Sequence, residues 1–197
     1  EGKNVISFSV GEPDFDTPEH IKKAAVDAIN EGFTKYTAAA GITELRQAVA
    51  KKLKDDNGLD YDYTQIVISN GAKHSLTNAL MAVLNPGDEV IIPAPYWLSY
   101  AEMVRLAGGT PVVVYTKQEE DFALTREVLE SGYSDKTKAV IITTPSNPTG
   151  MVMTEKQLRE IADFAVEKDI IVIADEIYEK LIYSDDKKHV SIASFGK

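Results

Sequence analysis

From Gln65 onward the sequence alternates short apolar runs with amphipathic stretches, and this alternation restricts the possible folds more than any other feature. Turn residues bound the apolar runs at residues 89–93, 111–115, 139–144 and 170–174. Strands that are apolar throughout are buried on both faces, which is typical of parallel strands joined by helices. The sequence therefore predicts an α/β protein with a mostly parallel sheet sandwiched by helices. A further short strand is expected at residues 66–69.

The composition argues against several classes of function. With 31 acidic and 21 basic residues the net charge is -10, whereas nucleic-acid-binding domains usually carry a basic patch. The chain has no cysteine, so disulfides and thiolate metal sites are excluded, and its histidines lack the spacing of a metal motif. No apolar run approaches the length that spans a bilayer. We therefore expect a cytoplasmic protein with no nucleic-acid, membrane or metal partner.

Loops that follow the predicted strands carry the side chains suited to ligand binding. Ligands of open α/β sheets bind beyond the carboxyl ends of the strands. In the first such loop, Gly71 and Ala72 are small and precede Lys73 at the start of a predicted helix. The first amides of a helix have no partner within the helix, and together with the helix dipole they attract an anion such as a phosphate. The alternative is a plain tight turn between a strand and a helix.

Two further loops carry an aromatic ring and an amide. Trp97 follows the strand at residues 89–93 and is suited to stacking on a planar ligand, although a lone tryptophan is also a common core residue. Asn147 follows the strand at residues 139–144, where its amide could bind a ligand oxygen. The Asn-Pro and Thr-Gly pairs around it are also turn formers.

The fourth loop follows the apolar strand at residues 170–174 and carries Asp175 and Tyr178. A carboxylate in this position can keep a ring nitrogen protonated, and a phenol three residues later can donate to a ring oxygen. The alternative for Asp175 is a helix cap after the strand. If the four loops meet at one edge of the sheet, they offer an anion site, a stacking ring, an amide, a carboxylate and a phenol, which together suit a phosphorylated pyridine ring.

At this point the sequence resembles a known family, the class I aminotransferases of pyridoxal-phosphate (PLP) fold type I. The resemblance rests on short motifs in the family's order along the chain: residues 10–15 (Val-Gly-Glu-Pro-Asp-Phe), 36–41, Leu45-Arg46, 71–73, Tyr96-Trp97, 147–150 and 175–178. The first of these motifs is similar to that of the bacterial aspartate aminotransferase branch.

The resemblance implies a cofactor, PLP, and a role for each loop. Asp175 would pair with the pyridinium nitrogen, so that the ring draws electrons, and Tyr178 and Asn147 would bind the ring oxygen. Trp97 would stack on the ring. The amides of Ala72 and Lys73, reached through Gly71, would hold the phosphate.

The resemblance also implies substrates and a partner subunit. Gly11 would lie beside the substrate carboxylate, together with Trp97 and Asn147, and Tyr36 would reach the phosphate of the neighbouring subunit in a homodimer. Lys73 is similar to a lysine that faces an acidic substrate side chain; the alternative is a solvated lysine in the first helical turn. The implied reaction is transamination between an amino acid, with aspartate as the expected donor, and 2-oxoglutarate.

One part of the family pattern is missing from these residues. The family's Schiff-base lysine lies in a Ser-Lys segment followed by Gly-Trp-Arg, which this sequence lacks, and Lys197 comes too soon after Asp175 to replace it. No residue is therefore assigned as catalytic, and the 197-residue chain is expected to be an inactive part of a longer protein. Residues 1–40 would be an N-terminal segment and interface arm, and residues 41–197 a partial, incomplete PLP-binding large domain.

Two other functions use the same cofactor site. A fold-type I lyase or synthase, such as a carbon–sulfur lyase, would share the residues that hold the cofactor and differ in those that face the substrate. A non-catalytic PLP-sensing domain of a transcription regulator would carry a basic DNA-binding module upstream. The residues quoted above do not separate these alternatives from an aminotransferase.

Overall fold

The computed structural model describes residue 6 and residues 11–196, which separate into two compact units, Glu1–Ala39 and Ala40–Lys197. The first unit contains helix α1, Glu19–Asn30, which follows Pro18 and has Glu19 in its first turn. Val10 and Lys197, which were considered in the sequence, lie outside the described residues. The assignment of residues 1–40 to an interface arm and of residues 41–197 to a partial cofactor domain stays a prediction.

The second unit alternates helices with strands, as the sequence predicts. Its helices are α2 (Thr43–Asn57), α3 (Ala72–Val83), α4 (Ser99–Leu106), α5 (Arg126–Gly132) and α6 (Glu155–Lys168), with short 3-10 turns η1 (Tyr63–Gln65), η2 (Gln118–Glu120) and η3 (Ile192–Phe195). Its strands are β1 (Glu89–Ala94), β2 (Thr110–Tyr115), β3 (Thr137–Thr143) and β4 (Ile171–Asp175). Gly58 ends α2 with a φ of 69°, a left-handed conformation that glycine adopts without strain.

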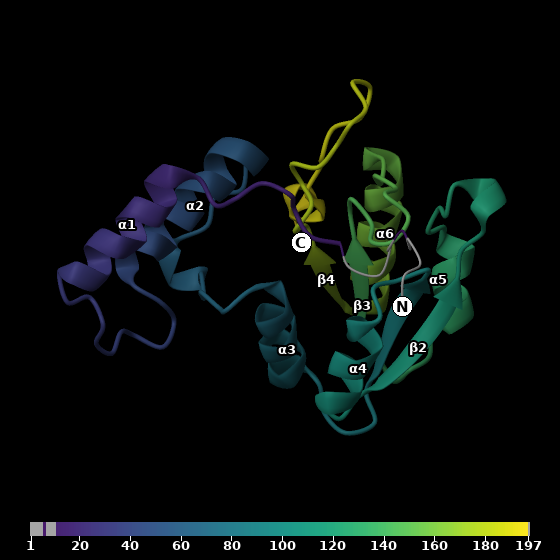
Figure 1. Cartoon of the computed structure of the whole chain (residues 1–197). Helices are drawn as coiled ribbons and strands as arrows, with labels where there is room; N and C mark the ends of the chain where they lie inside the picture. The colour runs from purple at the N-terminus through teal and green to yellow at the C-terminus, as the bar shows by residue number, and fades with distance from the viewer. Residues whose placement is uncertain (1–5, 7–10, 197) are drawn as a thin grey trace, which may run out of the picture. The chain divides into compact units, whose positions relative to one another are not determined.

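The four strands form one parallel sheet in the order β2-β1-β3-β4, which confirms the predicted fold class (Figure 1). The register pairs Ala94 with Tyr115 and Thr143 with Asp175, so the carboxyl ends of neighbouring strands lie side by side. Because every strand runs in the same direction, the loops after β1, β3 and β4 all leave from the same edge of the sheet.

Each face of the sheet packs against its own helices. Val90, Ile92 and Ile141 belong to a buried cluster that includes residues of α3 and α4, whereas their neighbours Ile91 and Val140 belong to a second cluster with residues of α5 and α6. Successive side chains of a strand point to opposite faces, and here both faces are covered. This is why the strands read as continuous apolar runs rather than as alternating ones.

The strand predicted at residues 66–69 is wrong. This segment has no strand conformation, and among the described residues its backbone contact to a distant part of the chain is a single hydrogen bond from Ile68 N to Ala40 O, at 3.0 Å. A strand needs a ladder of such bonds with a neighbour. Arg46 supports the segment instead, since its Nε donates to Ile66 O at 2.9 Å.

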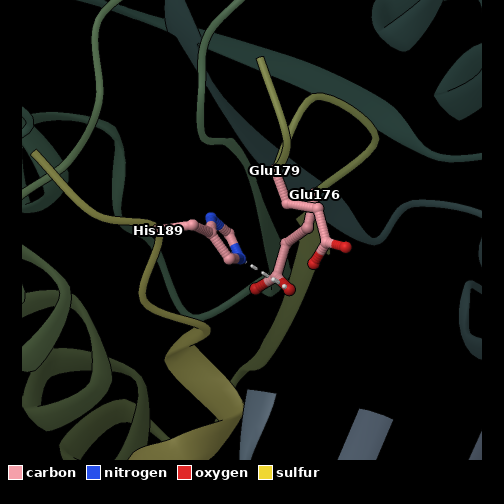
Figure 2. A group of neighbouring side chains, drawn as sticks. All are labelled: Glu176, Glu179 and His189. Carbon is pink, nitrogen blue, oxygen red and sulfur yellow. Dashed lines mark ion pairs between the residues drawn. The ribbon is translucent and has the colours of Figure 1, made fainter. Parts of the chain in front are cut away.

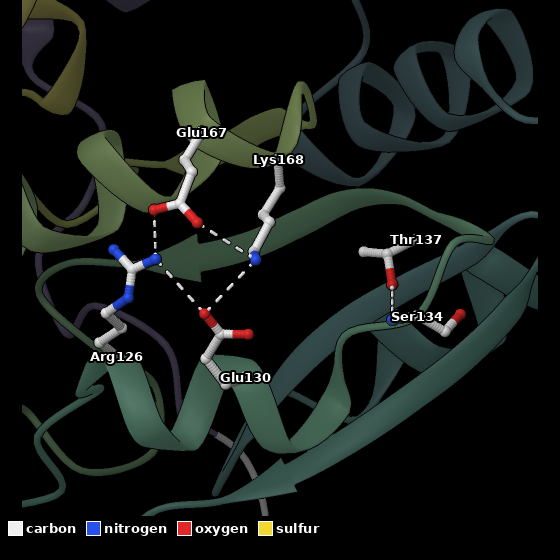
Figure 3. Close-up of polar contacts among 6 residues, drawn as sticks. All are labelled: Arg126, Glu130, Ser134, Thr137, Glu167 and Lys168. Carbon is white, nitrogen blue, oxygen red and sulfur yellow. Dashed lines mark hydrogen bonds and ion pairs between the residues drawn. The ribbon is translucent and has the colours of Figure 1, made fainter.

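Charged side chains on the surface join α5 to α6, which pack on the same face of the sheet (Figure 3). Arg126 Nη2 pairs with Glu167 and lies 3.3 Å from Glu130 Oε1. Lys168 Nζ lies 3.2 Å from Glu167 Oε1 and 3.6 Å from Glu130 Oε1. The hydrogen bond from Arg126 holds the pKa of the Glu167 carboxyl below its usual value. Three of the four side chains are exposed and Lys168 is partly buried, so the pairs align the helices more than they stabilise the fold.

The start of α6 offers a test of the local structure. Thr154 Oγ1 accepts from Gln157 N at 3.3 Å, and Gln157 Oε1 accepts from Thr154 N at 2.8 Å, which forms a capping box. We expect Thr154→Ala to lower the free energy of unfolding by about 1 kcal/mol, because the amide of Gln157 loses its acceptor. Urea denaturation measures this, and Lys156→Ala, whose side chain is 87% exposed, is the control. Equal midpoints for the two variants would show that the box contributes nothing.

Candidate functional site

A cavity of about 120 Å³ lies at the carboxyl-end edge of the sheet. The structure brings five of the predicted site residues to its wall, from four separate loops. The cavity is lined by Ala72, Trp97, Tyr100, Asn147, Asp175, Ile177 and Tyr178. Of these, only Tyr100 and Ile177 were not predicted from the sequence as site residues. The loops after β1, β3 and β4 therefore converge as the parallel sheet implied, and the loop before α3 joins them although residues 66–69 form no strand.

The anion-binding end of the cavity is the start of α3. The helix begins at Ala72, and Gly71 before it has a φ of 82°, which favours glycine. Among the described residues, no side chain caps this helix end. His74 Nδ1 instead accepts from Asn70 N at 3.1 Å, one residue before Gly71. The first backbone amides of α3 are consequently available to an anion.

Asp175 is the most constrained polar group of the site. Its side chain is buried, and Oδ2 accepts a hydrogen bond from the Tyr100 hydroxyl at 2.7 Å. Oδ1 accepts from Ile177 N at 3.2 Å, so Asp175 also caps the segment that follows it, but this segment is a turn and not the helix that the alternative required. The two bonds fix the carboxylate at the end of β4 and leave lone pairs of both oxygens for a ligand in the cavity.

Tyr100 is the functional residue that the sequence reasoning missed. Its hydroxyl lies between Asp175 and Thr143, 2.6 Å from Thr143 Oγ1, and its ring packs edge-on against Trp97 with centroids 5.4 Å apart. Burial raises the pKa of Tyr100 well above its usual value, and the neighbouring Asp175 adds to this, so the hydroxyl stays a donor. A signal existed in the sequence, because Tyr100 lies three residues after Trp97, at the start of the helix that follows; the structure closes this turn with a hydrogen bond from Tyr100 N to Trp97 O at 3.0 Å.

Trp97, Asn147 and Tyr178 are partly buried around this carboxylate. Trp97 packs against the apolar cluster under α4 and also lines the cavity, so the core and ligand readings of this residue are compatible. The loop of Asn147 is a turn closed by a bond from Gly150 N to Ser146 O at 2.8 Å. Such a turn holds Asn147 in place without using the hydrogen-bonding groups of its side-chain amide.

Three predicted residues are placed differently. Lys73 lies outside the cavity lining: its side chain is exposed, with Nζ 4.9 Å from the centroid of the Trp97 ring. Gly11 and Tyr36 belong to the first compact unit, and both are exposed. The roles suggested for these two residues stay predictions.

Comparisons with known proteins identify the family. The family model described as aminotransferase class I and II matches residues 3–196. The aspartate aminotransferase of Bacillus sp. (strain YM-2) is 49% identical over 197 residues, and a probable aspartate/prephenate aminotransferase of Aquifex aeolicus is 49% identical over 196. These residues cover 100% of this chain and 50% of each relative. The chain thus spans about half the length of the curated relatives it matches.

Solved structures give the same result. An aromatic aminotransferase from Pyrococcus horikoshii superposes with a TM-score of 0.94 and 51% identity, over 98% of this chain and 52% of that one. An aspartate aminotransferase from Thermus thermophilus with maleate superposes with a TM-score of 0.90 and 46% identity, over 93% and 48%. The chain belongs to the class I and II aminotransferase family. Enzymes of this family depend on PLP, and the donor groups of the cavity fit that cofactor.

Tyr100→Phe tests whether the Asp175 carboxylate depends on the hydroxyl. We expect the free energy of unfolding to fall by about 1–3 kcal/mol, because a buried carboxylate loses a donor. Tyr115→Phe is the control, since that side chain is 77% exposed. Since the folded-state pKa of Tyr100 is raised, the advantage of the wild type should be complete below the unfolded value of about 10 and decline above it. Denaturation curves that coincide for both variants at neutral pH would contradict the role.

Proposed function

We propose that the whole protein is a PLP-dependent aminotransferase that moves an amino group between an amino acid, with aspartate as the expected donor, and 2-oxoglutarate. The observation that carries this proposal is the convergence of Ala72, Trp97, Asn147, Asp175 and Tyr178 on one cavity. Several relatives are named aspartate aminotransferases, and others are named for prephenate or aromatic amino acids. The names support amino-group transfer over a lyase or a regulator.

Each residue of the chain would have a separate task at this site. When bound, PLP supplies an aldehyde that can carry an amino group and a ring that draws electrons from the reacting carbon. Asp175, held by Tyr100, would keep a proton on the ring nitrogen, and Tyr178 and Asn147 would bind the ring oxygen. Trp97 would cover one face of the ring, and the first amides of α3 would hold the phosphate.

The chain also contains residues proposed to bind the substrate and the phosphate of a partner subunit. Gly11 would leave room for the substrate carboxylate, and Lys73 would attract an acidic side chain from the rim of the site. Tyr36 would contact the phosphate in the neighbouring subunit of a homodimer.

A cytoplasmic location belongs to the same proposal. The described helices include none that is both long and apolar enough to cross a membrane.

The 197 residues alone are predicted not to transaminate, because they contain no lysine in a Ser-Lys segment followed by Gly-Trp-Arg. That lysine would be both the covalent anchor and the proton carrier. The test mixes this chain with PLP, aspartate and 2-oxoglutarate and follows oxaloacetate, with the full-length protein and PLP alone as controls. The expected rate equals that of PLP alone. Multiple turnovers above that rate would contradict the prediction.

Asp175→Asn in the full-length protein tests the site itself. The change keeps the shape of the side chain and removes its charge, so the ring nitrogen loses the group that keeps it protonated. We expect kcat to fall on the order of 100-fold. Asp163→Asn on the exposed side of α6 is the matched control. Steady-state kinetics that give both variants the same kcat would show that Asp175 does not act on the cofactor.

A further inference from the structure

A second group of chemically capable side chains lies just behind the cavity wall. Glu176 and Glu179 come from the turn after β4, and His189 comes from the segment that leads to η3 (Figure 2). Each offers one ligand atom, and these atoms all lie within 4.8 Å of one another. None of the three lines the cavity of the proposed cofactor site.

His189 is more than nine-tenths buried and lacks hydrogen bonds. Its side chain is 9% exposed, and within the described part of the chain neither ring nitrogen has a hydrogen-bond partner; the same holds for Glu176 Oε1. Nε2 lies 3.2 Å from Glu176 Oε2, which is ion-pair distance if the ring is protonated, but the geometry is not that of a hydrogen bond. Buried polar atoms are normally paired, so the cluster has unused binding capacity.

The charges around the cluster favour a cation. Lys52 pairs with Glu179, and Asn57 Nδ2 donates to the same carboxylate at 2.9 Å. Lys180 Nζ pairs with Asp56 Oδ2 at 2.9 Å, so the Asp56 carboxylate offsets its positive charge. With His189 neutral, two carboxylates and one ammonium leave the cluster with a net negative charge.

We propose that Glu176, Glu179 and His189 bind a divalent transition-metal ion of the Zn²⁺ type. One imidazole nitrogen with two carboxylate oxygens is a donor set that Zn²⁺ accepts. Nε2 of His189 faces the glutamates and would bind the ion, and Nδ1 would carry the proton. A carboxylate has about four lone-pair positions, so Lys52 and Asn57 leave Glu179 able to bind. The ion would draw the ligands together, because Zn²⁺ holds nitrogen and oxygen ligands at about 2.0–2.2 Å.

The ion would act on structure rather than on the reaction. Glu176 directly follows Asp175, and Glu179 directly follows Tyr178. A metal that holds both glutamates would fix the turn between two residues of the cofactor site. Glu179 is also tied to α2 through Lys52 and Asn57, so the same ion would join that helix to the end of β4. The sequence predicts no metal partner, because the histidines lack the spacing of a metal motif, so this site is a departure from that prediction.

Zinc titration of the full-length protein, tag-free and stripped of metal with a chelator, tests the proposal. We expect one Zn²⁺ per chain by calorimetry and a rise in Tm of a few degrees with excess Zn²⁺. His189→Gln and Glu176→Gln should each weaken Zn²⁺ binding by about 10-fold or more and abolish the rise in Tm. His20→Gln, at an exposed position, is the matched control and should behave as the wild type.

The result that overturns the proposal is equally definite. If the wild type binds no stoichiometric Zn²⁺, or if Glu176→Gln binds it as tightly as the wild type, the cluster is only a histidine–glutamate ion pair. Glu176→Gln keeps the size of the side chain, so it decides the matter even if His189→Gln does not fold, and circular dichroism checks the fold of each variant. None of these readouts depends on PLP or on activity.

Discussion

The parallel direction of all four strands is the constraint on which the rest of this structure depends. It places the ends of β1, β3 and β4 at one edge of the sheet, so side chains far apart in sequence meet there. The register brings Asp175 beside Thr143, and Tyr100 joins both through its hydroxyl. The cavity is therefore a consequence of strand order and direction, and the buried apolar clusters on both faces keep it in place.

Hydrogen bonds around Asp175 connect the fold to the proposed chemistry. A buried carboxylate is costly unless its oxygens are paired, and here Tyr100 and the amide of Ile177 supply that pairing. Both donors hold the side chain in one position before any ligand binds. Preorganised charge of this kind needs no rearrangement during a reaction, which is why such groups are effective in catalysis.

The sequence was sufficient for the four strands of the sheet and for most of the residues that line the cavity. Apolar runs identified β1 to β4, and loop position identified Ala72, Trp97, Asn147, Asp175 and Tyr178 as neighbours. Residues 66–69 have the composition of a strand, but strand formation depends on a partner that composition does not reveal. Tyr100 was missed because its contact with Asp175 spans 75 positions. The cluster of Glu176, Glu179 and His189 was missed because the chain after β4 must fold back before His189 reaches the two glutamates.

A crystal structure of the full-length protein with PLP is the most direct test of the central claim, that these loop ends hold one phosphorylated pyridine ring. The predicted result is a ring nitrogen within hydrogen-bonding distance of the Asp175 carboxylate and a phosphate on the first amides of α3. A cofactor bound elsewhere, or one whose ring nitrogen faces away from Asp175, would contradict the claim.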